Sequence, residues 1–306
     1  MLTKLSQLKQ IAENQQVKKR LVLCAAADEH SLDAVYHAYK EGVITPILVG
    51  NEEKIRKMME EYGFFFIEDD IRIVHETKPN KMVETSIKLI RNGEGDILMK
   101  GHITTAELLR GVLNKEWGLK EKKVLSHFAL FEIPAYHKLL ALTDVAMNIS
   151  PDLEAKMGII NNSVEFMGRI GVETPKIAAI AAVEMVNEKM SATTDAALLS
   201  IMNRRGQIRN CTIDGPLAFD NAISFESSEH KGIKGEVAGD ADLLLVPDIE
   251  AGNVLYKAFV FFANAKVASI ILGASVPVVL TSRADSEETK LNSIRLAAAS
   301  AADFEV

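Results

Sequence analysis

Short apolar runs rich in β-branched residues alternate along the chain with longer segments whose apolar residues recur every three to four positions. The runs predict strands and the longer segments predict helices. This alternation is typical of βαβ units that build a parallel sheet. The predicted strands of the first half are 20–26, 44–49, 70–74, 96–100, 123–132 and 139–147, and the predicted helices are 30–41, 51–62, 80–92 and 104–114.

A second series of the same kind begins near Pro151. Its predicted helices are 152–171, 192–205 and 250–265, and its predicted strands are 176–182, 211–214, 242–247 and 267–281. Residues 225–240 show no apolar periodicity and predict a loop, and 286–303 predict a final helix. We therefore expect an α/β protein with two domains, the first formed by 1–138 plus 286–306 and the second by 139–285.

Composition narrows the classes of function. The 306 residues include 35 Lys and Arg against 42 Asp and Glu, and this net charge of -7 argues against nucleic acid as a partner. Cys24 and Cys211 form no CxxC pair, so we expect reduced, structural thiols. The first twenty residues lack a signal-peptide pattern, and Gly273 and Pro277 interrupt the most apolar stretch. We expect a cytoplasmic protein with no membrane partner.

Several common catalytic motifs are absent from the sequence. No GxGxxG follows a strand, and neither GxxxxGK[ST], HExxH nor GxSxG occurs. The seven histidines show no metal-ligand spacing. We therefore expect no metal site and no permanently bound cofactor.

The first candidate site is a turn that follows the predicted strand 96–100. Thr104 and Glu107 have the spacing of a capping box at the start of a helix. Free backbone N–H groups and the positive end of a helix dipole suit an anion, although an ordinary βα turn would look the same. The candidate binding residues here are Gly101, His102, Thr104 and Thr105.

The second candidate site is the turn after the predicted strand 267–281. Thr281, Ser282 and Arg283 stand ahead of a helix, and hydroxyl and guanidinium groups grip phosphate through charge-assisted hydrogen bonds. Asp285 has the spacing of the N-cap of that helix, with Glu288 as its N3 partner. Alternatively, Arg283 pairs at the surface with Asp285 or Glu287.

Two more strand-end turns lie in the second half, at 214–220 and 247–253. Gly252 permits close approach of a backbone or a ligand, and Asn253 follows it. Asp248 is either a site residue or the cap of the next helix. Four such turns, spread over both halves, predict one ligand cleft between the two α/β domains.

These turns carry a resemblance that spans about residues 20–300. The segments are DEHSLDAVYHAYKEGVITPILVG at 28–50, GHITTAELLRGVL at 101–113, DGPLAFDNAIS at 214–224, PDIEAGNVLYK at 247–257 and LTSRADSEETKLNSI at 280–294. Together they resemble the phosphate acetyltransferase and phosphate butyryltransferase family. The resemblance implies two three-layer αβα domains, related to isocitrate and isopropylmalate dehydrogenases, with the active site in an interdomain cleft.

The resemblance also implies an activity: reversible transfer of an acyl group between coenzyme A and inorganic phosphate. Acyl-coenzyme A and phosphate would be the substrates of a homo-oligomer. In the acetyl branch, a Ser-Arg pair is followed six positions after the Arg by an Asp thought to be the base. Ser282 and Arg283 match the pair, but Thr289 stands at the position of the base.

The departure at Thr289 favours the butyryl branch, and hence butanoate metabolism, and leaves the base unassigned. Glu287, Asp248 and His127 are the candidate bases, and Ser126 beside His127 is a candidate binding residue. Three alternatives stay open: a phosphate acetyltransferase, an NAD-linked decarboxylating dehydrogenase of related fold, and a non-catalytic two-lobed protein that binds an anion.

Overall fold

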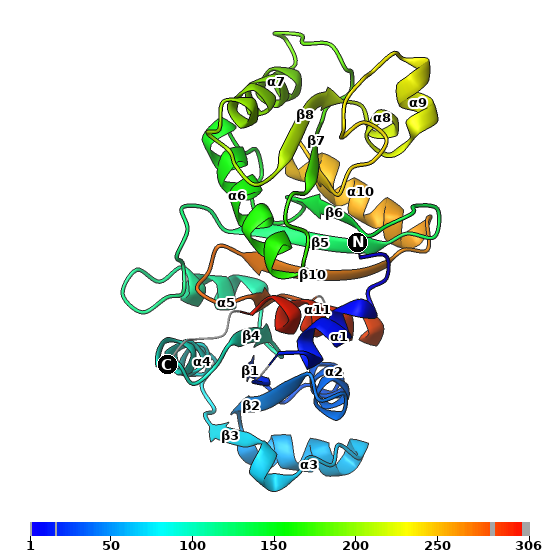
Figure 1. Ribbon diagram of the computed structural model, residues 1–306. Coiled ribbons are helices and arrows are strands. Elements are labelled where there is room, and N and C mark those ends of the chain that lie inside the picture. The colour runs from blue at the N-terminus through cyan, green and yellow to red at the C-terminus, as the bar shows by residue number, and fades with distance from the viewer. Residues whose placement is uncertain (1, 16, 282–284, 302–306) are drawn as a thin grey trace. The chain divides into compact units, whose positions relative to one another are not determined.

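The computed structural model describes residues 2–15, 17–281 and 285–301. The chain forms two compact units (Figure 1): unit 1 comprises Met1–Leu5 and Val124–Val267, and unit 2 comprises Ser6–Lys123 and Ala268–Val306. Among the described residues, no helix combines the length and the apolarity needed to cross a membrane.

Unit 2 is built on a largely parallel sheet with the strand order β3-β2-β1-β4-β11-β10. The strands are β1 (Lys19–Cys24), β2 (Ile44–Gly50), β3 (Arg72–His75), β4 (Ile97–Lys100), β10 (Lys266–Leu272) and β11 (Val278–Val279). Among these described strands, β10 is antiparallel to β11, and the other neighbouring pairs are parallel. The helices are α1 (Gln7–Glu13), α2 (Glu29–Lys40), α3 (Glu52–Tyr62), α4 (Pro79–Arg91), α5 (Thr105–Val112) and α11 (Glu287–Ser300), with a 3₁₀ turn at Glu68–Asp70.

Unit 1 holds strands in the order β5-β6-β9-β7-β8. They are β5 (Ser126–Glu132), β6 (Leu140–Thr143), β7 (Lys176–Ile180), β8 (Thr212–Leu217) and β9 (Leu243–Leu245), and β5 is antiparallel to β6 while the others are parallel. The helices are α6 (Leu153–Arg169), α7 (Ser191–Arg204), α8 (Phe219–Ile223), α9 (Phe225–His230) and α10 (Ile249–Phe261). The α/β prediction is confirmed.

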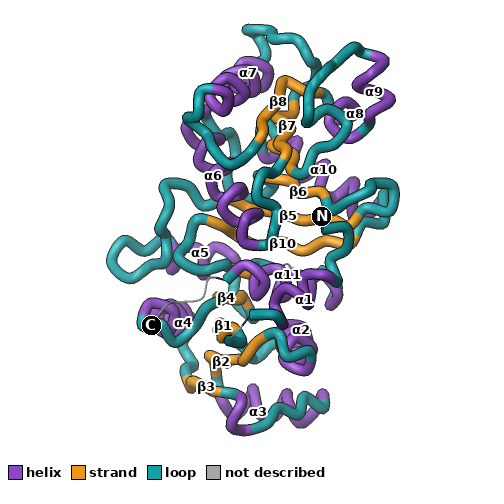
Figure 2. Tube along the Cα trace, viewed as in Figure 1, coloured by secondary structure: helices purple, strands orange, loops and turns teal. Residues whose placement is uncertain are grey.

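Helices cover both faces of the strands in each unit (Figure 2). In unit 2, α4 packs on β1, β2 and β4, and α2 and α11 pack on each other. In unit 1, apolar side chains of β5, β6, β9 and α10 share one core, with Phe131, Leu142, Leu244 and Phe259 among its buried members. Most strands bury side chains on both faces, as expected where helices flank a parallel sheet, whereas the edge strand β3 is partly exposed.

The two units divide the chain at other points than the predicted 138/139 and 285/286. Residues 124–138 belong to unit 1, because β5 pairs with β6. Residues 268–281 belong to unit 2, where β11 pairs with β4. The partner that places 268–281 in unit 2 is distant in the sequence, and such a partner leaves no local signal.

Two predicted elements differ from the structure. The strand predicted at 267–281 is two strands, because Gly273 adopts a left-handed backbone (φ 91°) after which the chain reverses. The loop predicted at 225–240 contains the short helix α9, whose N-cap Ser224 accepts a hydrogen bond from the N–H of Ser227. Helices as short as α1, α8 and α9 span too few turns to show a periodicity.

The strand directions gather polar turns at one edge of each sheet. In unit 2, the parallel strands β1, β2, β4 and β11 end at the same edge. In unit 1, the carboxyl ends of β6, β7, β8 and β9 and the amino end of antiparallel β5 share an edge. We call these the carboxyl edges, and ligands of open α/β sheets bind there.

Candidate functional site

The turn after β4 in unit 2 is held against the end of β1. The N–H groups of Gly101 and His102 donate to the carbonyls of Cys24 and Ala25, each at 2.8 Å. A Cβ atom on Gly101 would lie 2.4 Å from the Ala25 oxygen, which no side chain tolerates. Glycine is required here by the approach of two backbones, whether or not a ligand binds.

The predicted capping box at the start of α5 is confirmed. The Oγ1 of Thr104 accepts from the N–H of Glu107 at 3.2 Å and donates to Glu107 Oε2 at 2.6 Å, and that oxygen also accepts from the N–H of Thr104. Thr105 and His102 are exposed, and His102 Nδ1 lies 3.7 Å from Asp28 Oδ1. The exposed polar residues of this turn are thus His102, Thr104 and Thr105.

A buried lysine lies under the same turn. Lys100 Nζ donates to the carbonyls of Gly101 and Ile103, each at 3.3 Å. Burial raises the pKa of Cys24 to about 11, so this thiol stays protonated at neutral pH. Cys24 and Cys211 are both free and buried, as predicted. Lys100 was not predicted as a site residue, since its charge sits at the end of an ordinary apolar run.

The end of β11 lies beside this turn. The register pairs Val279 with Met99, which brings the buried Thr281 to the level of Gly101 at the carboxyl edge. Ser282 and Arg283 lie outside the described residues. Glu287 is exposed in the first turn of α11. Unit 2 therefore brings the turn 101–105 and Thr281 to one edge.

The predicted N-cap of the final helix is wrong by one residue. Ser286, not Asp285, caps α11: its Oγ accepts from the N–H of Thr289 at 3.1 Å. Serine and aspartate cap helices comparably well, so the sequence alone does not choose between two adjacent caps.

In unit 1, the amino end of β5 places Ser126 and His127 at the carboxyl edge. Both are buried. Asn162 of α6 donates from Nδ2 to Ser126 Oγ at 3.1 Å and to the Val124 carbonyl at 2.9 Å. The Oγ1 of Thr143 donates to the His127 carbonyl at 2.8 Å. These bonds fix the backbone on which the imidazole stands.

The His127 imidazole is buried with an unsatisfied nitrogen. His127 is 7% exposed, and the Nδ1 of its ring is buried without a hydrogen-bond partner among the described residues. Burial lowers the pKa of His127 to about 4, and the negative charge of Asp144 partly opposes that shift. The Tyr256 ring lies edge-on at 6.2 Å. The imidazole is thus neutral at neutral pH.

Asp144, immediately after β6, is a buried carboxylate with three donors. Its Oδ1 accepts from the N–H groups of Ala146 and Met147 at 3.0 Å, and its Oδ2 accepts from Asn148 Nδ2 at 2.5 Å. Asn148 Nδ2 also donates to the Leu125 carbonyl, two residues before His127. Asp144 was not predicted as a site residue, although an aspartate directly after the apolar run 140–143 is a usable signal.

The first turn of α10 packs against the backbone of Asp144. Asp248 is the N-cap and accepts from the N–H of Ala251 at 2.8 Å, which confirms the capping interpretation. A Cβ atom on Gly252 would lie 2.8 Å from the Asp144 carbonyl oxygen. Gly252 therefore lets α10 approach this loop, and Asn253 beside it is exposed. Unit 1 brings Ser126, His127, Gly252 and Asp248 to one edge.

A neutral imidazole with a free nitrogen, beside a fixed carboxylate, is suited to accept a proton. No group of three or more His, Cys, Asp or Glu side chains in the described ranges is arranged to hold a metal ion.

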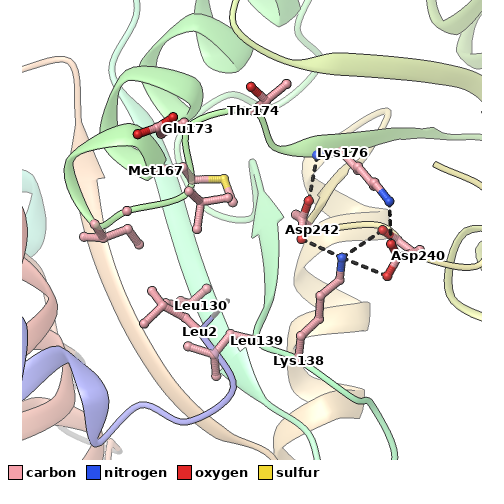
Figure 3. A pocket seen from close by; sticks show the side chains of 13 residues that line it. Leu2, Leu130, Lys138, Leu139, Met167, Glu173, Thr174, Lys176, Asp240 and Asp242 are labelled. Atoms are coloured by element: carbon pink, nitrogen blue, oxygen red, sulfur yellow. Dashed lines mark hydrogen bonds and ion pairs between the residues drawn. The ribbon is translucent and has the colours of Figure 1, made fainter. Parts of the chain in front are cut away.

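The opposite edge of unit 1 holds a pocket of about 230 Å³ that no predicted site residue lines (Figure 3). On its polar wall, Lys138 Nζ lies 2.9 Å from Asp240 Oδ1 and 2.6 Å from Asp242 Oδ1. Lys176 Nζ lies 2.6 Å from Asp240 Oδ2, and His137 Nε2 lies 2.8 Å from Asp240 Oδ1. Leu130, Leu139 and Met167 contribute to the apolar wall. We call Lys138, Lys176, Asp240 and Asp242 the ion cluster.

The sequence is similar to those of a known protein family and of several known enzymes. The family described as Phosphate acetyl/butaryl transferase matches residues 67–298. The chain is 49% identical over 280 residues to a phosphate butyryltransferase of Clostridium acetobutylicum, covering 92% of each chain. It is 46% identical over 280 residues to a phosphate acetyltransferase of Thermotoga maritima, covering 92% of this chain and 94% of that one.

A solved structure is also similar. The branched-chain phosphotransacylase from Enterococcus faecalis V583 superimposes with a TM-score of 0.82 at 35% identity, covering 92% of this chain and 99% of that one.

Proposed function

The chain belongs to the phosphate acetyl/butaryl transferase family, and from this membership we propose that it transfers a short acyl group reversibly between coenzyme A and inorganic phosphate. Butyryl is the favoured acyl group. The observation that carries the proposal is the 49% identity with a phosphate butyryltransferase over 92% of the chain. Acetyl is the second candidate, because a phosphate acetyltransferase is 46% identical. The family match favours neither the dehydrogenase nor the anion-binding alternative.

The reaction requires one proton transfer. The coenzyme A thiol, with a pKa of about 8.5, loses its proton, and the thiolate attacks the carbonyl of the acyl phosphate. The carbon–sulfur bond forms as the carbon–oxygen bond to phosphate breaks. The leaving phosphate takes up the proton that the base removed, so thioester and hydrogen phosphate are the products. The reverse reaction follows the same steps in the opposite order.

We assign the base to His127 among the three candidates. The Oδ1 of Asp248 is engaged as a helix cap, and Glu287 is exposed on the first turn of α11. His127 is neutral, and its Nδ1 has no partner among the described residues. An imidazole accepts a proton from a thiol only while it is neutral.

Phosphate and coenzyme A would be bound by the predicted anion residues. These are Gly101, His102, Thr104, Thr105, Ser126, Gly252, Asn253, Thr281, Ser282 and Arg283. The Arg283 guanidinium would stabilise the charge that grows on the leaving phosphate. We expect Arg283→Ala to lower kcat about a hundredfold or more, and Arg283→Lys to restore little, because a point charge lacks the bidentate fork. Near-normal kinetics of Arg283→Ala would remove Arg283 from the site.

We propose that the protein works in butanoate metabolism in the cytoplasm as a homo-oligomer. Helix α10 supports an oligomer, because its residues Val254 and Phe261 and its C-cap Phe262 are exposed, the last at 90%. Apolar side chains gathered on one exposed face mark contacts between proteins. Light scattering during gel filtration measures the mass, and a monomer would contradict this assignment.

The activity is tested by incubating the protein with butyryl-coenzyme A and phosphate and following the free thiol and the butyryl phosphate formed. We expect both products in equal amounts. The value of kcat/KM for butyryl-coenzyme A should exceed that for acetyl-coenzyme A by about tenfold or more, since two methylene groups enter an apolar pocket. Equal or reversed values would favour acetyl, and no thiol from either substrate would refute the function.

A further inference from the structure

Asp144 is buried, and the two backbone hydrogen bonds that its Oδ1 accepts do not by themselves require a negative charge. Residue 144 is 3% exposed, and its Oδ1 accepts from two backbone N–H groups of the following turn. An asparagine Oδ1 would accept the same two bonds without a charge. Burial of an ionised carboxylate costs several kcal/mol. The backbone bonds of the turn therefore do not require an aspartate, whereas the second oxygen, Oδ2, accepts from Asn148 Nδ2, which an asparagine amide nitrogen could not do.

Asp144 lies close to His127, because the antiparallel register that pairs Ala129 with Leu142 continues towards residues 127 and 144, and Thr143 Oγ1 donates to the His127 carbonyl. Among the charged groups of the described residues, Asp144 is the one whose charge acts on the His127 ring, and it favours the protonated ring. The other titratable group against the imidazole is the Tyr256 phenol of α10, whose ring meets it edge-on. From α6, Asn162 contributes an amide next to His127 and no charge.

Asn148 ties the carboxylate to the strand that carries the imidazole. A single Nδ2 group donates to Asp144 Oδ2 and to the Leu125 carbonyl at 2.8 Å. Gly252 admits α10 against the Asp144 backbone, where a side chain would collide. The position of the carboxylate relative to the start of β5 is thus fixed from two sides.

We propose that Asp144 is a positioning residue for acyl transfer, which stabilises the imidazolium formed when His127 takes the thiol proton. The proposal rests on the proposed function. Both Asp144 oxygens are engaged by the protein, so the carboxylate acts through its charge on His127 and does not contact the substrates. In the step, the S–H bond breaks, the N–H bond forms on His127, and no proton moves to Asp144.

A double-mutant cycle on kcat tests this role. We expect Asp144→Asn to lower kcat about tenfold or more while KM for both substrates stays within about twofold, because only the transition state gains the imidazolium charge. In a His127→Gln background, Asp144→Asn should have no further effect, since the partner is gone. An equal loss in both backgrounds would show a merely structural role and overturn the proposal, as would no loss in the wild-type background.

Asp152→Asn is the matched control, because the Asp152 carboxylate likewise accepts a backbone N–H three residues along the chain in unit 1, that of Ala155 at 2.8 Å. It should leave kcat unchanged in both backgrounds. Should Asp144→Asn fail to fold, Asn148→Ala replaces it in the cycle, with the same non-additivity expected and additivity overturning the proposal. Failure of the proposed function would appear separately, as a wild-type protein that releases no thiol.

Discussion

The two edges of the unit 1 sheet both bury charge, but they satisfy it differently. At one edge, the ion cluster gives each Lys138 proton an acceptor and pairs Asp240 with both lysines. At the carboxyl edge, Asp144 is fully bonded, yet His127 Nδ1 beside it has no partner among the described residues. Buried polar groups stabilise a fold when each has a hydrogen-bond partner. A buried titratable nitrogen without a partner is typical of a group that takes part in a reaction.

The contrast separates two explanations for perturbed pKa values. Partial burial raises the pKa of Asp240, but hydrogen bonds from Lys176, Lys138 and His137 outweigh it and hold the pKa well below its usual range. For His127, burial dominates and the neighbouring charge compensates only in part. Both edges therefore hold a group with a strongly shifted pKa, and the shift alone does not identify the functional edge. The free nitrogen distinguishes the carboxyl edge.

The largest expected effect is that of His127→Gln on catalysis. Without the base, kcat at neutral pH should fall by about 10²–10⁴, while the melting temperature stays close to that of the wild type. The thiol-release assay with butyryl-coenzyme A measures the fall. Unchanged kcat would show that the unpaired nitrogen has no part in the reaction.

Next in size is Lys138→Met in the ion cluster. Its side chain is 2% exposed, and removal leaves two acidic groups without their central partner, so the free energy of unfolding should fall by about 3–5 kcal/mol. The kcat of the folded protein should stay normal. Lys176→Met is the control: that side chain is 33% exposed, and its loss should cost no more than about 1 kcal/mol. If Lys138→Met lowered kcat without lowering stability, the ion cluster would serve catalysis and not stability, which would contradict this account.

Acid should act on the two edges in separate ranges of pH. The pKa of His127 is lowered from 6.5 to about 4 in the folded state, so the unfolded chain binds the proton first. Stability is complete above the unfolded value and should fall by about 3 kcal/mol as pH drops from about 6.5 to about 4. The loss of stability that comes from Asp240 begins below about pH 4, where this carboxyl group titrates in the unfolded chain. Urea unfolding at several pH values should show that His127→Gln removes the first loss alone.

The smallest effect concerns Gly252. In Gly252→Ala, the new methyl group would press on the Asp144 carbonyl, and we expect stability to fall by about 1–3 kcal/mol, with a lower kcat. Gly168→Ala in α6 is the control, because its new methyl group would meet no described neighbour within 4 Å and alanine favours a helix by about 1 kcal/mol. Thermal unfolding distinguishes the two, and a stabilised Gly252→Ala would contradict the close approach.

Local signals predicted much of the fold. Strands such as 44–49 and the capping box at Thr104 depend on residues near one another in the sequence, and the structure confirms them. The pairing of β11 with β4 joins strands far apart in the sequence that carry no local mark of each other, so this part of the division into units was not predictable. The same reason hid Asp144, whose value lies in its proximity to His127.

The central claim is that His127 removes the thiol proton, and the pH dependence of His127→Gln tests it most directly. A thiol ionises without help as the pH approaches its own pKa of about 8.5. The ratio of wild-type kcat to His127→Gln kcat should therefore shrink by about tenfold or more between about pH 6.5 and about pH 8.5. A ratio that stays constant over this range, in a variant that binds coenzyme A normally, would contradict the account.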